Sequence, residues 1–162
     1  MRSKKTALYG LLVALAFILS YIETLIPFSI LPGIKLGLAN LVVMTALYGM
    51  GSKEAFVLSF IRIILVGFTF GNLSTMLYSL AGGMLSWLIM VLAKKSKWFS
   101  MVGVSILGGV FHNIGQIIVA ILTVSNVYII TYLPLLLITG VITGALIGFL
   151  GSLIVKRIQG LF

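Results

Sequence analysis

Six runs of apolar residues, separated by short stretches that hold most of the charged residues, dominate the pattern of this 162-residue chain. A helix that crosses a membrane needs about 20 mostly apolar residues, and most of the runs approach that length. The pattern predicts an all-α fold, an integral membrane bundle of six transmembrane helices that forms one domain over residues 1–162. The predicted spans are Thr6–Leu25, Leu36–Met50, Ala55–Phe70, Leu73–Ala93, Phe99–Val124 and Tyr128–Val155.

Composition favours a membrane protein over a soluble one. Hydrophobic residues make up 61% of the chain and charged residues only 8%, with a mean hydropathy of +1.29, whereas soluble domains carry about 25% charged residues. The net charge of +9 comes from short basic clusters between apolar runs, as in cytoplasmic loops. We therefore expect a lipid bilayer, and no nucleic acid, around the protein. The run Thr6–Leu25 ends without a clean small-residue cleavage site, which favours a retained span over a signal peptide.

The second run, Leu36–Met50, is the ambiguous one. Its 15 residues would form a helix of about 22 Å, short of the roughly 30 Å hydrocarbon core, so it could be re-entrant. Positive charge is concentrated in cytoplasmic loops, and that bias favours a span. With six spans and a cytoplasmic N-terminus, all basic residues except Lys35 and the intramembrane Arg62 face the cytoplasm. We therefore predict that both the N- and the C-terminus are cytoplasmic.

Small residues on the predicted spans indicate how the helices pack. Close helix packing in membranes uses glycine and alanine at four-residue spacing. The sixth run has such a series at Gly140, Gly144 and Gly148. The fourth run contributes Gly82 and Gly83, and the fifth contributes Gly108 and Gly109. We expect these residues to pack inside the bundle. Ala7, Gly10 and Ala14 form a similar face on the first run, which could pack internally or receive a partner helix.

Polar side chains within apolar runs are costly and mark functional candidates. In the predicted orientation they converge on the outer half of the bundle, beside the Pro- and Gly-containing connection Ile26–Lys35. Such an arrangement is typical of a pocket for a small polar or amphiphilic solute that arrives from outside. The candidate substrate-binding residues are Lys35, Asn40, Arg62, Asn72, Thr75, Tyr78, His112, Asn113 and Gln116.

Arg62 is the most informative of these residues. It falls near the predicted midplane, and we expect no acidic residue at its depth, because Glu54 is too near the cytoplasmic end and Glu23 nearly half a membrane away. An anionic ligand could satisfy the guanidinium through charge-assisted hydrogen bonds. Alternatively, Arg62 could bond to backbone carbonyls or extend toward an interface. For His112, a binding role and a hydrogen bond within the bundle are both open.

The chain lacks the residues that several kinds of catalysis require. It has no aspartate and no cysteine, and its two acidic residues are distant glutamates, so no carboxylate cluster can hold Mg²⁺. No phosphate-binding loop is present. The single histidine lacks an acidic partner for acyl transfer and enough further ligands for a metal site. We expect no enzymatic activity, no metal and no other cofactor, and ATP hydrolysis would require another subunit.

The stretch from Pro32 to Asn40, with the sequence PGIKLGLAN, carries a family resemblance together with the six-run layout and the small face of the first run. The chain resembles the substrate-binding S-components of energy-coupling factor (ECF) transporters, and more narrowly the Gx-transporter group often labelled heptaprenyl diphosphate synthase component I. The resemblance implies a bacterial cytoplasmic membrane and a first loop that closes over a small-molecule substrate. It also implies three partners, an ECF coupling transmembrane subunit that contacts Ala7, Gly10 and Ala14, and two cytosolic ATPase subunits.

The synthase label needs its own interpretation. A prenyl diphosphate synthase uses aspartate-rich motifs, which this chain lacks, so we interpret the label as one derived from gene neighbourhood. It points to an isoprenoid or quinone precursor as the substrate, whose phosphate or diphosphate Lys35 and Arg62 would suit.

Two other functions are open. The chain could be an accessory membrane subunit that anchors a partner enzyme and binds no solute, or a stand-alone carrier or channel, although no internal repeat favours a carrier. An accessory subunit predicts that Arg62 and His112 contact only protein. An S-component predicts a closed outer cavity lined by both residues, and a first helix whose small face is exposed.

Overall fold

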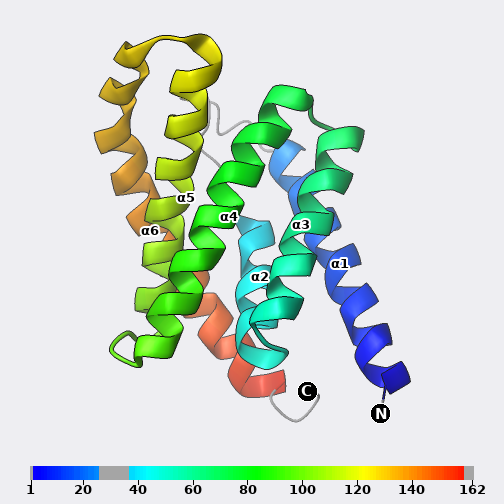
Figure 1. Ribbon diagram of the computed structural model, residues 1–162. Helices are drawn as coiled ribbons and strands as arrows, with labels where there is room; N and C mark the ends of the chain where they lie inside the picture. Colours follow the sequence, from blue (N-terminus) through cyan, green and yellow to red (C-terminus); the bar gives the residue numbers. More distant parts are fainter. Residues whose placement is uncertain (1, 26–36, 159–162) are drawn as a thin grey trace.

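The computed structural model describes residues 2–25 and 37–158, with side chains from Thr6 onward. Every regular element in this part of the chain is helical (Figure 1), which confirms the predicted all-α class. The elements are α1 (Arg2–Leu25), α2 (Leu38–Gly49), α3 (Ser52–Thr69), α4 (Leu73–Ser96), α5 (Met101–Val124), the 3₁₀ helix η1 (Val127–Tyr132) and α6 (Leu133–Ile158).

Four of the described segments are long and apolar enough to cross a membrane, namely Thr6–Leu25, Leu73–Ser96, Met101–Val124 and Val127–Ile158. The helix α3 has 18 residues and carries Lys53, Glu54 and Arg62. The helix α2 has only 12 residues, about 18 Å of helix. These lengths and compositions are consistent with a multi-pass membrane protein.

The short helix α2 is buried on all sides. Seven of its twelve residues are buried, and it contacts α1, α3 and α6. A helix that is apolar around its whole circumference belongs inside a protein. Its Met44 and Leu47 are among the largest fully buried side chains, and the main hydrophobic core surrounds them. Because neighbouring helices enclose α2, its ends need not reach both surfaces of a membrane.

The predicted runs and the observed helices differ by a few residues at several ends, and two of these differences have a clear structural cause. The second run was expected to begin at Leu36, but α2 begins at Leu38, after Gly37 in a left-handed conformation with φ of 74°. The prediction of one helix from Tyr128 is also wrong, because the 3₁₀ helix η1 precedes α6. Pro134 lies at the second position of α6, where its missing N–H costs no helical hydrogen bond.

Glycines bring α4, α5 and α6 into close contact, as the sequence predicts. A Cβ on Gly109 would lie 2.5 Å from the carbonyl oxygen of Gly140, and one on Gly144 would lie 2.8 Å from the Cα of Ile106. On the other side of α5, a Cβ on Gly115 would lie 2.8 Å from the carbonyl oxygen of Ala81. These backbones therefore pack against one another at distances that only glycine permits.

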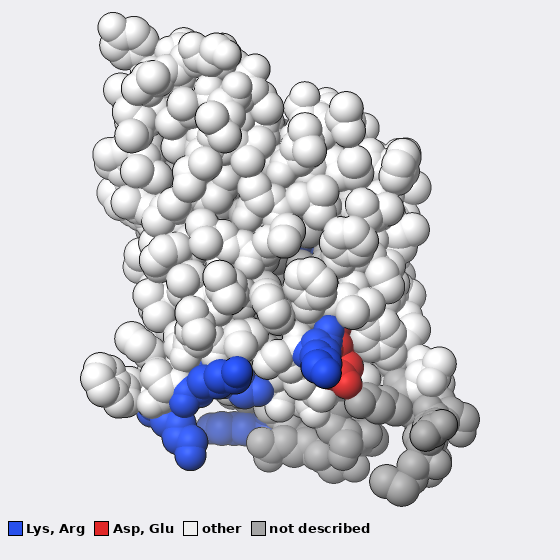
Figure 2. Space-filling model, viewed as in Figure 1, with Lys and Arg blue, Asp and Glu red and all other residues white. Residues whose placement is uncertain are grey.

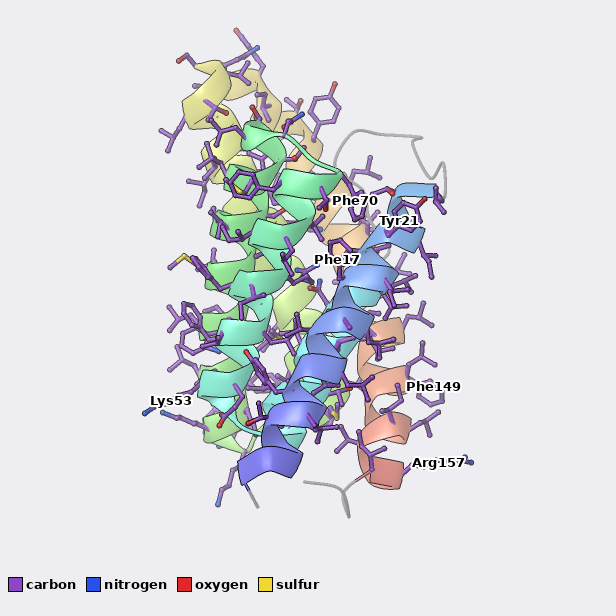
Figure 3. The ribbon with its side chains drawn as sticks, turned by 90° about the vertical axis from the view of Figure 1, so that its right-hand side faces the viewer. Phe17, Tyr21, Lys53, Phe70, Phe149 and Arg157 are labelled. Carbon is purple, nitrogen blue, oxygen red and sulfur yellow. The ribbon has the colours of Figure 1, made fainter. Side chains whose placement is uncertain are left out.

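Basic side chains gather at one end of the bundle, which we call the basic end (Figure 2). Lys53 at the start of α3 and Arg157 at the end of α6 both lie there (Figure 3), as do Lys94 and Lys95 in the last turn of α4. The helices α1, α3 and α5 run away from the basic end, and α2, α4 and α6 run back toward it (Figure 1). The 3₁₀ helix η1 lies at the opposite end.

Candidate functional site

A cavity of about 180 Å³ lies in the half of the bundle away from the basic end. It is lined by the C-terminal halves of α1 and α3, the N-terminal parts of α2, α4 and α6, and the middle of α5. Its apolar lining comes from residues such as Ile63, Val66 and Phe70. Its polar lining consists of Ser20, Glu23, Thr24, Asn40, Arg62, Thr75, Ser79, His112, Asn113, Gln116, Thr139 and Thr143.

Six of the nine predicted substrate-binding residues line this cavity, namely Asn40, Arg62, Thr75, His112, Asn113 and Gln116. Residues separated by up to 76 positions are thus brought together from four helices. Asn72 and Tyr78 are not among its lining residues, and Lys35 lies outside the described residues, as does the whole predicted loop Ile26–Lys35. A role in binding stays a prediction for every one of these residues.

The hydrogen-bonding capacity of Arg62 is only partly used. Its terminal nitrogen donates to Oδ1 of Asn40 at 3.4 Å, which is a long hydrogen bond. Its Nε is buried and has no hydrogen-bond partner in the part of the chain that the structure describes. A guanidinium has five N–H donors, and leaving buried donors unpaired is costly. The site therefore retains an unmet demand for an acceptor or an anion.

The expectation that no acidic residue lies near Arg62 is wrong. Glu23 lines the same cavity, and its charge interacts electrostatically with that of Arg62, although no direct ion pair joins these two residues. The depth estimate failed because it counted positions along separate straight helices, whereas Glu23 lies at the end of α1 where that helix packs against α2 and α3.

The first turn of α2 holds both charged residues of the site. The backbone N–H of Leu38 donates to Oε1 of Glu23 at 2.9 Å, and Asn40 accepts from Arg62. The left-handed Gly37 directly precedes this turn and also lines the cavity. A carboxylate at a helix N-terminus is stabilised by the free N–H groups and the helix dipole. Glu23 thus fastens the end of α1 to the start of α2.

Phe70 forms part of the cavity wall and anchors α1. Its ring lies between those of Phe17 and Tyr21, with centroid distances of 5.1 and 4.9 Å (Figure 3). Tilted aromatic pairs at this separation are attractive. These contacts hold the C-terminal half of α1 against the end of α3, beside Glu23.

On α5, Asn113 both lines the cavity and bonds to α6. Its Nδ2 donates to the carbonyl oxygen of Leu136, which also accepts from Oγ1 of Thr139. His112 lies one residue earlier on the same wall, and Gln116 one turn later. Three predicted residues of α5 therefore line one cavity, and one of them, Asn113, also takes part in helix packing.

Asn72 and Tyr78, the two described candidates that do not line the cavity, serve in a helix cap and in a contact between helices. Asn72 caps α4, where its side chain accepts from the N–H of Thr75 at 2.8 Å and the hydroxyl of Thr75 accepts from the N–H of Asn72 at 2.9 Å. Tyr78 shares a hydrogen bond with Thr123 on α5, with the two oxygens 3.1 Å apart. Asn72 and Thr75 look alike in sequence, because a capping residue and a cavity residue near the start of a helix are both short and polar.

A protein-family model matches residues 12–154, under the description heptaprenyl diphosphate synthase component I. This chain belongs to that family. The resemblance recognised in the sequence is thereby confirmed at the level of the family, whose description names a component of heptaprenyl diphosphate synthase. Comparisons with curated proteins and with solved structures gave no significant match.

The small-residue face of α1 is open. Ala7, Gly10 and Ala14 are all exposed, and a Cβ added to Gly10 would meet nothing within 4 Å. The other glycine series, on α6, is filled by α5. Of the small faces named from the sequence, the one on α1 is therefore the one without an internal partner among the described residues.

Sequence reasoning missed several residues of the site. Glu23 shares a helical face with Ser20 and Thr24, and Thr139 lies one turn before Thr143, so polar residues at spacings of three and four were a usable signal. Cavity glycines were missed as well. Met76 packs closely against Gly67, since a Cβ on Gly67 would lie 2.9 Å from the sulfur of Met76. No pattern along one helix indicates which side chain faces a glycine on another.

Proposed function

We propose that this protein is a membrane component that works with a partner enzyme, as an accessory subunit of heptaprenyl diphosphate synthase. The observation that carries the proposal is the family match over residues 12–154. The composition supports a non-catalytic role, because the chain has no aspartate and metal-dependent diphosphate chemistry relies on carboxylate clusters. The catalytic residues then belong to the partner, and this chain anchors it at the membrane.

We further propose that all six helices serve as spans of a bacterial cytoplasmic membrane, with both ends of the chain in the cytoplasm. The basic end supports this topology, because Lys and Arg accumulate on the cytoplasmic side of membrane proteins. The helix α3 would cross with Arg62 turned into the cavity rather than toward lipid. The short α2 would lie within the membrane, inside the ring that its neighbouring helices form.

A second candidate function is the capture of a small solute, as in the S-component of an ECF-type importer. The cavity favours this function, since it is lined by both Arg62 and His112 and an accessory subunit has no need for it. The exposed face of Ala7, Gly10 and Ala14 would then receive a coupling transmembrane subunit, which in turn would carry two cytosolic ATPase subunits.

One purification distinguishes the two functions. Tagged protein is isolated from its native membranes in mild detergent, and both the co-purifying proteins and the bound small molecules are identified by mass spectrometry. The same is done for Arg62→Gln and for Lys53→Gln. Lys53 is a matched control, because it is an exposed basic residue on the same helix at the other end of the bundle.

An accessory subunit predicts that a catalytic subunit of heptaprenyl diphosphate synthase co-purifies with all three proteins and that none carries a stoichiometric solute. Solute capture predicts a bound molecule that is present in the wild type and in Lys53→Gln and absent from Arg62→Gln. A preparation with neither the synthase subunit nor a solute would contradict both functions.

A further inference from the structure

The charge balance and size of the cavity limit what it can hold. Among its described lining residues, Glu23 and Arg62 are the charged ones, so the two opposite charges compensate each other. A volume of about 180 Å³ suits a small solute.

The two charges are not equally satisfied. The carboxylate of Glu23 accepts from the N–H of Leu38 at the start of α2, where the helix dipole also stabilises it. Arg62 has one long hydrogen bond, to Asn40, and a buried Nε without a described partner. The unmet demand therefore lies at the guanidinium, where a carboxylate would supply acceptor oxygens and a matching charge.

We propose that the cavity binds a small amphiphilic monocarboxylate, with its carboxylate at Arg62, and that Glu23 makes the site discriminate against phosphate and diphosphate groups. The proposal rests on the solute-binding function, the second candidate above. It replaces the expectation of a phosphorylated isoprenoid with a different ligand class, and it assigns Glu23 a role in specificity.

The geometry gives each part of such a ligand a place. A carboxylate carries one charge and matches the planar guanidinium. A phosphate monoester carries nearly two negative charges at neutral pH, so one of them would face Glu23 without a second cation among the described lining residues. Ile63, Val66 and Phe70 offer an apolar wall for the body of the molecule, as is usual in small-molecule pockets.

Three probes that share one ring test the proposal. Benzoate, neutral benzamide and dianionic phenyl phosphate are each added to the purified wild-type protein in detergent at pH 7.5. Binding is followed by thermal unfolding and by calorimetric titration. The same measurements are made on Glu23→Gln, Arg62→Gln and the control Lys53→Gln. Glutamine at position 23 keeps an oxygen that can accept from Leu38, so this variant removes the charge with little change of shape.

We expect the wild type and Lys53→Gln to bind benzoate at least tenfold more tightly than either of the other probes. Benzamide lacks the charge that strengthens a hydrogen bond to the guanidinium. Phenyl phosphate places a second negative charge near Glu23, and juxtaposed like charges cost more than a tenfold change in affinity. Arg62→Gln should abolish the preference for benzoate over benzamide. Glu23→Gln should tighten the binding of phenyl phosphate by about tenfold or more, on the same grounds.

Two results of the binding measurements would overturn the proposal. One is binding of phenyl phosphate to the wild type as tight as that of benzoate, and the other is an absence of benzoate binding. The comparison within the wild type requires no variant, so a failure of Arg62→Gln to fold does not remove the test. A solute that co-purifies with the wild type and carries a phosphate would contradict the monocarboxylate class while leaving the solute-binding function intact.

Discussion

Asn113 shows how a single polar side chain is used inside this bundle. It is partly buried, it lines the cavity, and its amide nitrogen donates to the carbonyl oxygen of Leu136 on the neighbouring helix. Arg62 differs from it, because its buried Nε has no described partner. Asn113 therefore serves helix packing, whereas Arg62 has a buried donor that a hydrogen-bond acceptor could still satisfy.

The hydrogen bond of Asn113 can be tested by Asn113→Leu, which keeps a similar volume and removes the donor. We expect the free energy of unfolding in detergent to fall by roughly 0.6–1.7 kcal/mol, from the mean to the maximum measured for interhelical hydrogen bonds by double-mutant cycles. The measurement is unfolding by a denaturing detergent without added ligand. Thr123→Val, which removes an exposed hydrogen bond to Tyr78, is the control and should cost less. Equal stability of Asn113→Leu and wild type would contradict this interpretation.

The helices divide into two kinds by how they meet their neighbours. The helices α4, α5 and α6 approach one another at glycines, where an added Cβ would overlap backbone atoms of the neighbouring helix. The helix α1 contacts α2 and α3 and has large exposed apolar side chains such as Leu11 and Ile18. Its small face is therefore free for lipid or for a partner, whereas the α5–α6 face is not.

A pair of glycine substitutions tests this division. Gly109→Ala places a Cβ 2.5 Å from the carbonyl oxygen of Gly140, so we expect it to destabilise the fold by about 1–3 kcal/mol, the usual cost of overpacking. Gly10→Ala is the matched control, because its Cβ meets nothing within 4 Å, and its effect should stay within about 0.5 kcal/mol. The free energy of unfolding of both purified variants is measured in the same detergent. Equal losses of stability would show that the two faces do not differ.

Across the bundle, charge, core and cavity are segregated along one axis. Basic residues lie at one end (Figure 2), the main core surrounds α2, and the cavity lies in the half beyond Arg62. The position of the basic end agrees with the proposed orientation, because Lys and Arg accumulate on the cytoplasmic side of membrane proteins.

The proposed orientation can be measured with single cysteines, since the chain has none of its own. Val127 in η1 and Trp98 between α4 and α5 are 68% and 89% exposed and lie at opposite ends of the bundle. We expect a membrane-impermeant maleimide to label Val127→Cys on intact cells, and Trp98→Cys only after the cells are permeabilised. Labelling of Trp98→Cys on intact cells would overturn the proposed orientation.

The order of apolar and polar residues along the chain was enough to predict most of the helices and six of the residues that line the cavity. Apolar runs near the length of a membrane span correspond to α1, α3, α4, α5 and α6 within a few residues, because burial of apolar side chains in lipid acts on each run separately. Polar residues inside those runs marked Asn40, Arg62, Thr75, His112, Asn113 and Gln116, all of which line one cavity. The cost of an intramembrane polar group is itself a local property.

Relations between helices were decided by packing in three dimensions. Glu23 reaches the cavity of Arg62 because Phe70 and the first turn of α2 hold the end of α1 in place. The short α2 fits because its neighbours enclose it, and Asn72 caps a helix instead of lining the cavity. Such contacts depend on crossing angles and on which glycine faces which backbone, and these arise only when all the helices compete for the same interior space.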